Sequence, residues 1–118
     1  MKNRMKFILI TLISLLLVCS AFASVETAAE SIVENSNNVL YHLIEITKDQ
    51  AAKLIANGAT EEEISELGEL MVFRAEKITS GAANALDQLG VTYEVYYIEV
   101  CLGYNLTYYV DPIKIVDD

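Results

Sequence analysis

The sequence predicts an α+β domain in which an antiparallel helical hairpin precedes a β-hairpin, the order ααββ. Apolar residues recur every three or four positions from Val25 to Leu89, as they do in amphipathic helices. From Val91 onward β-branched residues and tyrosine dominate, which favours strands. The chain of 118 residues is long enough for one small core, and we expect a single acidic domain over residues 24–118.

Residues 1–23 have the composition of an export signal. Three basic residues precede an uncharged apolar run, Phe7–Val18, and the series ends at Ala21-Phe22-Ala23. We expect cleavage after Ala23. The apolar run is shorter than the about 20 residues that a bilayer span needs, although an uncleaved anchor is the alternative. We therefore expect a secreted or periplasmic protein with no stable membrane span after signal cleavage.

Residues 24–58 form the first predicted helical segment. Its apolar stripe consists of Val25, Ala29, Ile32, Val39, Leu43 and Ile46. Poor helix formers at Asn35–Asn38 and a capping-box pattern at Thr47–Gln50 are both compatible with a break. One long helix and two shorter helices therefore both fit this segment.

Residues 60–90 form the second predicted helix, and its start is the clearest boundary in the sequence. Asn57-Gly58 is a good helix stop, and Thr60 with Glu63 three residues later has the form of a capping box. Gly90 ends the helix. The expected buried stripe is Ile64, Leu67, Met71, Ala75, Ile78, Ala82, Ala85 and Leu89. The short link between the helices implies an antiparallel helical hairpin.

Residues 91–116 form the predicted β-hairpin, with Gly103-Tyr104 as a candidate two-residue turn. Six of the seven tyrosines lie in this segment: Tyr93, Tyr96, Tyr97, Tyr104, Tyr108 and Tyr109. Tyrosine suits a half-buried strand, and it is also enriched at binding surfaces. An isolated two-stranded hairpin is marginal in water, so this one must pack on the helices or pair with another chain.

Charge and cysteine content restrict the partners. Residues 24–118 hold five of the eight basic residues and all seventeen acidic ones, a net charge of −12. Nucleic acid is excluded as a partner because phosphate binding requires a basic surface. Cys101 is the only cysteine after residue 23, so no intramolecular disulfide forms there, a pattern typical of a small exported bacterial domain. Its neighbours Val100 and Leu102 favour a buried thiol, with an intermolecular bridge as the alternative.

No catalytic pattern stands out. After residue 23 the sequence has one histidine, His42, and one cysteine, Cys101, which are too few for a zinc site within one copy. Glu94, Glu99 and Asp111 are candidates for a carboxylate pair, but seventeen acidic residues bring some together by chance. We expect a protein that is not an enzyme and has no metal or other cofactor.

These observations favour an interaction module. We expect the helical hairpin to be the scaffold and the six hairpin tyrosines to form the contact surface for a protein partner or for a second copy in a homodimer. The alternative with complete burial of the tyrosines within one copy stays open. A second hypothesis is a small-ligand binding protein that holds a sugar or a cationic group on aromatic faces. A minimal carboxylate hydrolase is the third.

Overall fold

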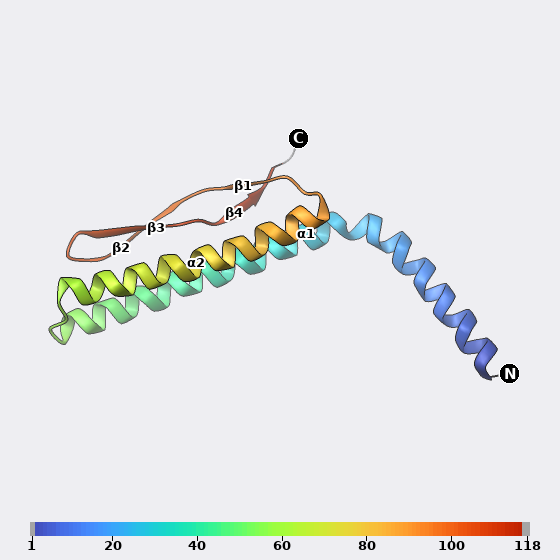
Figure 1. Ribbon diagram of the computed structural model, residues 1–118, viewed down its shortest axis with the longest axis horizontal. Helices are drawn as coiled ribbons and strands as arrows, with labels where there is room; N and C mark the ends of the chain where they lie inside the picture. Colours follow the sequence, from blue (N-terminus) through green and yellow to red (C-terminus); the bar gives the residue numbers. More distant parts are fainter. Residues whose placement is uncertain (1, 117–118) are drawn as a thin grey trace.

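The computed structural model describes residues 2–116, with side chains from Ser24 onward. Its elements are α1 (Lys2–Ala56), α2 (Glu61–Leu89), β1 (Tyr93–Val95), β2 (Ile98–Gly103), β3 (Leu106–Val110) and β4 (Ile113–Ile115). Two antiparallel helices form one layer, and the strands form a second layer on one face of it (Figure 1). The predicted α+β class, with a helical hairpin followed by a β-hairpin, is confirmed for these residues. The predicted signal cleavage lies outside the described side chains.

Helix α1 runs without interruption through both segments in which the sequence was compatible with a break. At the first segment, the side chain of Asn37 bonds the backbone of Ile113 in strand β4. At the second, the Thr47 hydroxyl donates to the carbonyl of Leu43 at 2.7 Å, which is compatible with a continuous helix. The polar residues that suggested a break therefore make contacts that a helix permits.

The buried side of α1 differs from the predicted stripe. The buried residues are Ala29, Ser36, Leu40, Ile44, Thr47 and Ala51. Val39 and Ile46, which we expected in the core, are 52% and 43% exposed. The helix contacts both α2 and the hairpin, so its buried arc turns toward both neighbours and includes two hydroxyl residues.

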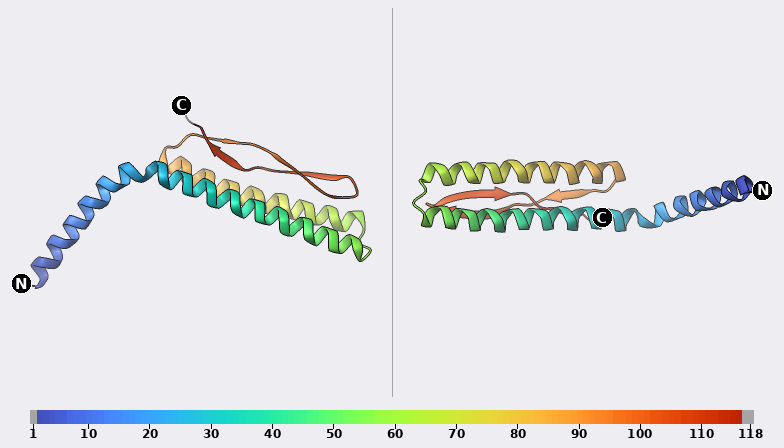
Figure 2. Two further views of the ribbon diagram at one scale, coloured as in Figure 1. Left: turned by 180° about the vertical axis from the view of Figure 1, so that it is seen from behind. Right: turned by 90° about the horizontal axis from the view of Figure 1, so that it is seen from below.

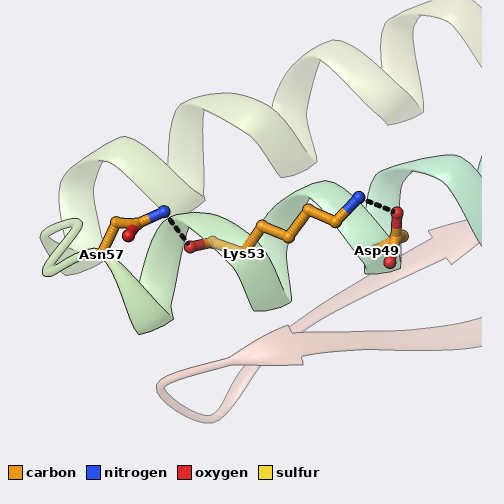
Figure 3. Close-up of polar contacts among 3 residues, drawn as sticks. All are labelled: Asp49, Lys53 and Asn57. Carbon is orange, nitrogen blue, oxygen red and sulfur yellow. Dashed lines mark hydrogen bonds and ion pairs between the residues drawn. The ribbon is translucent and has the colours of Figure 1, made fainter.

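The link between the helices has the predicted cap. The Glu63 amide donates to the Thr60 side chain at 3.2 Å, and Gly58 adopts a φ of 87°. The last turns of α1 carry two local contacts (Figure 3). Lys53 forms an ion pair with Asp49 at 2.9 Å, and the Asn57 side-chain amide donates to the Lys53 carbonyl at 2.9 Å. The sequence signals at this boundary therefore act locally, as expected.

Helix α2 ends at a left-handed Gly90, also as expected. Its buried residues are Ile64, Gly68, Met71, Ala75, Thr79, Ala82 and Leu86. Leu67, Ile78, Ala85 and Leu89 from the predicted stripe are half-buried instead. Here too the buried arc is rotated toward the hairpin, because the strands cover a line of small and polar residues on α2.

The β-hairpin is divided into two short ladders. Strand β2 pairs with β3, and β1 pairs with β4, both antiparallel. Between the ladders, Tyr96-Tyr97 lies opposite Asp111-Pro112, where Pro112 has no amide hydrogen to donate. The Tyr96 amide still donates to the Pro112 carbonyl at 3.0 Å, and the Thr79 hydroxyl of α2 donates to the Asp111 carbonyl at 2.8 Å. The interruption is therefore held against α2.

The tight turn lies one residue later than we predicted. Tyr104 and Asn105 form it, with φ of 52° and 60°, as in a type I′ turn. Gly103 precedes the turn with a φ of 118°, at a register shift between Cys101 and Gly103. Glycine is thus needed for the irregularity that leads into the turn, and the turn itself uses the tolerance of asparagine for positive φ.

The hairpin lies along the groove between the two helices (Figure 2). One core cluster joins residues of both helices with Val100, Leu102 and Val110, and a second joins Ala29, Ala82 and Leu86 with Ile113. Within the described side chains, no helix is long and apolar enough to cross a membrane.

Candidate functional site

Three of the six candidate tyrosines direct their hydroxyl groups at the helical layer. Tyr104 donates to the carbonyl of Ala59 at 2.6 Å, and Tyr108 donates to the carbonyl of Ser65 at 3.3 Å. The hydroxyl of Tyr96 lies 3.2 Å from that of Tyr41. These contacts fasten the hairpin along its length, so these three tyrosines have structural roles.

Tyr93, the fourth tyrosine on this side, packs against the second core cluster, to which both helices and β4 contribute. The ring of Tyr108 lies directly on Gly68 of α2. Any Cβ atom at Gly68 would overlap that ring. Glycine at position 68 therefore makes room for the Tyr108 ring on α2.

The hydroxyl pair between Tyr41 and Tyr96 affects ionisation. The hydrogen bond with Tyr41, together with partial burial, raises the pKa of Tyr96 to about 12. Both effects favour the neutral hydroxyl of Tyr96 over the tyrosinate in the folded structure.

The other two tyrosines face solvent. Tyr97 is 71% exposed and Tyr109 is 58% exposed, which excludes the alternative with all six tyrosines buried. Glu99, which is the cross-strand partner of Tyr109, is exposed as well. We call the outward surface formed by Tyr97, Glu99, Cys101, Thr107 and Tyr109 the tyrosine face.

Cys101 lies on this face, and the prediction that its thiol is buried is wrong. Strand alternation places Val100 and Leu102 in the core and turns Cys101 outward. Its sulfur lies 3.7 Å from the hydroxyl of Thr107, its cross-strand partner. Apolar neighbours in a strand point to the opposite face, so they are no guide to the burial of the residue between them.

A crevice of about 400 Å³ lies between β2 and α1. Its lining residues are Tyr41, Ile44, Glu45, Lys48, Ile98, Glu99, Val100 and Cys101. Only one of these residues is aromatic. The tyrosines of the hairpin do not converge on this crevice, since Tyr97 and Tyr109 are absent from its walls.

The structure reveals a second surface that the sequence interpretation missed. On the side of the helical layer away from the hairpin, α1 exposes Val39 and Ile46, and α2 exposes Leu70 and Phe73. A shallow groove of about 360 Å³ there is lined by Val39, His42, Leu43, Ile46, Arg74, Lys77 and Ile78. We call this surface the helical face. A second apolar stripe on each helix was the available signal, because one core-facing stripe leaves Leu70 and Phe73 unexplained.

Possible catalytic and metal-binding groups stay apart. His42 is exposed on α1, whereas Cys101 is on the outward side of β2. Within residues 24–116, no group of three histidine, cysteine, aspartate or glutamate residues is placed to hold a metal ion. Glu94, a candidate for a carboxylate pair, instead forms an ion pair with Lys114 at 3.4 Å.

No protein-family model matches the chain, and searches of curated proteins and of solved structures gave no match. The two exposed surfaces are therefore the features that bear on function.

Proposed function

We propose that this chain is an exported, non-enzymatic interaction module that binds a polypeptide partner through the tyrosine face. The observation that carries the proposal is the outward position of Tyr97 and Tyr109 on a hairpin whose other tyrosines all have contacts with the helices. Large aromatic side chains that stay in solvent supply rigid contact area for a partner.

The chemistry of the tyrosine face favours a partner that presents a lysine or arginine. Glu99 pairs with Tyr109 across the ladder, and Tyr97 lies two residues before Glu99. Within residues 24–116, Glu99 has no ion-pair partner. A carboxylate near aromatic side chains attracts a cation by its charge, and the ring faces add to that attraction. The net charge of −12 for residues 24–118 also steers basic proteins toward the module.

A small-ligand function has less support. A sugar or free cation is usually held in a concave site that encloses most of it. The tyrosine face lies outward, and Tyr41 is the single aromatic residue in the crevice beside β2. A hydrolase has less support again, because the candidate Glu94 is paired with Lys114.

Position-specific cross-linking in the native organism tests the proposal. A photoreactive residue at Thr107, on the tyrosine face, is expected to form an adduct with one protein species, whereas the same residue at the exposed Gln88 of α2 should not. The cross-linked species is then purified and its binding measured with the isolated module. Tyr97→Ala and Tyr109→Ala should each weaken binding about tenfold or more.

The charge at the tyrosine face has its own matched control. Glu99→Gln and Glu76→Gln each remove one exposed carboxylate, but Glu76 lies on α2. Only Glu99→Gln should weaken binding beyond the small general effect of net charge. Equal binding by wild type, Tyr97→Ala and Tyr109→Ala would refute the proposed contact surface.

Export is tested separately by the mass of the protein recovered from the periplasm or medium. We expect a chain that starts at Ser24. Recovery of the chain with residues 1–23 still attached, in a membrane fraction, would contradict this part of the proposal.

A further inference from the structure

The helical face is apolar along its centre and lies opposite the hairpin. Val39 and Ile46 from α1 and Leu70 and Phe73 from α2 are all at least two-fifths exposed. The hairpin covers the other side of the helical layer, and no described element covers this side (Figure 2). Exposed apolar side chains gathered on one side of a protein often mark a contact site for another chain.

Charged residues on α2 follow a symmetric order along this face. Glu63, Glu66, Leu70, Arg74 and Lys77 are spaced by three or four residues, so they lie on one stripe of the helix. Acidic residues precede Leu70 and basic residues follow it. Glu66 and Arg74 are each four residues from Leu70, and Glu63 and Lys77 are each seven residues from it. All five side chains are exposed.

The basic half of this stripe lacks ionic partners within residues 24–116. Arg74 and Lys77 form no ion pair there, and Lys77 instead lies 4.6 Å from the centre of the Phe73 ring. In a chain with many carboxylates, the groove lined by Arg74 and Lys77 has no acidic residue in its wall. Carboxylates that balance the positive charge of Arg74 and Lys77 must therefore come from outside the groove.

We infer that the helical face binds a second copy of this chain, with the two α2 helices antiparallel about a twofold axis at Leu70. In this arrangement, a residue that follows Leu70 in one subunit lies level with the residue that precedes Leu70 by the same number of positions in the partner subunit. Arg74 then faces Glu66 of the partner subunit, and Lys77 faces Glu63 of the partner subunit. Each ion pair occurs twice, as an isologous interface requires.

The apolar residues fit the same arrangement. Phe73 is three residues after Leu70 and Leu67 is three before it, so Phe73 faces Leu67 of the partner subunit. From α1, the groove is lined by Val39, Leu43 and Ile46. The twofold axis that places the two α2 helices against each other also places the two α1 helices against each other. The result is two helical layers packed face to face, the arrangement of an antiparallel helical bundle. This inference is independent of the tyrosine face.

Sedimentation over a range of concentrations tests the dimer, with protein produced from the full chain so that its N-terminus is processed as in the cell. Wild type should show a monomer–dimer equilibrium. Leu70→Glu should raise the dissociation constant about a hundredfold or more, because two like charges then meet on the axis. Thermal unfolding followed by circular dichroism checks that this exposed substitution leaves the monomer folded.

Charge reversal tests the register. Arg74→Glu should weaken the dimer about tenfold, and the double variant Glu66→Arg/Arg74→Glu should restore it to within about threefold. Lys48→Glu is the matched control, since it makes the same charge reversal beside β2, outside the helical face. Tyr97→Lys should also leave the dimer intact.

Three outcomes overturn the inference. Wild type that stays monomeric shows that another molecule, or nothing, covers the helical face. Weakening by Lys48→Glu as strong as that by Arg74→Glu shows that only net charge acts. Loss of the dimer in Tyr97→Lys, with no effect of Leu70→Glu, moves the interface to the tyrosine face.

Discussion

Asn37 is the residue whose replacement best tests how the two layers are joined. Its side-chain amide donates to the Ile113 carbonyl at 2.8 Å, and the Ile113 amide donates to its side-chain oxygen at 3.1 Å. Asn37 thus satisfies both backbone groups of Ile113 in β4, as a neighbouring strand would. Ile113 itself is fully buried.

Asn37→Ala leaves both of these backbone groups without their partner. A buried polar group that loses its hydrogen bond costs about 1–3 kcal/mol, whereas the alanine regains up to about 0.7 kcal/mol of helix propensity. We expect a net loss of about 2–3 kcal/mol in the free energy of unfolding. Asn37→Asp should also destabilise, because its carboxylate keeps the acceptor but sets an oxygen beside the Ile113 carbonyl.

Urea unfolding followed by circular dichroism measures the effect, and Asn38→Ala is the matched control. Asn38 is the next residue of α1 and is exposed, so its replacement tests helix propensity without the contact to β4. We expect Asn38→Ala to be neutral or slightly stabilising. Equal unfolding midpoints for Asn37→Ala and Asn38→Ala would refute the reasoning, since the bonds to β4 would then contribute nothing.

Three further predictions concern single contacts. Gly68→Ala should destabilise by about 1–3 kcal/mol because its methyl group meets a tyrosine ring, whereas Gly81→Ala, with open space around it, should stabilise by up to about 1 kcal/mol in the same urea assay. Thr60→Ala should cost on the order of 1 kcal/mol in that assay, and an unchanged midpoint would show that the cap is unimportant. With the pKa of Tyr96 at about 12, the free energy of unfolding should fall as the pH rises from about 10 to 12, because Tyr96 ionises at lower pH in the unfolded chain. Titration followed by tyrosinate absorbance should show one tyrosine that ionises at higher pH than the others. Tyr41→Phe should lower the pKa of Tyr96 toward its ordinary value.

The sequence predicted those parts of the fold that depend on local chemistry. Thr60 and Gly90 mark the ends of α2 because a cap and a left-handed glycine act within one helical turn. The change from helix to strand near Val91 was equally clear, since it follows from residue type.

Features that depend on the second layer were harder to predict. Gly68 and Thr79 are buried because the hairpin lies over them, and neither residue belongs to the apolar pattern of the sequence. The outward position of Cys101 follows from strand alternation, which turns it away from the core that its neighbours Val100 and Leu102 enter. At the candidate site, the sequence identified the tyrosines as a group. The separation of Tyr97 and Tyr109 from the other four required the structure.

The two-layer architecture has a consequence for valency. The helices separate the tyrosine face from the helical face, so contact on one side leaves the other side free (Figure 1). A dimer joined through its helices would display two tyrosine faces that point in opposite directions. Such a particle can link two partner molecules into a chain, but it cannot place both faces on one flat surface. Its binding to a surface-attached partner should therefore gain no avidity from dimerisation.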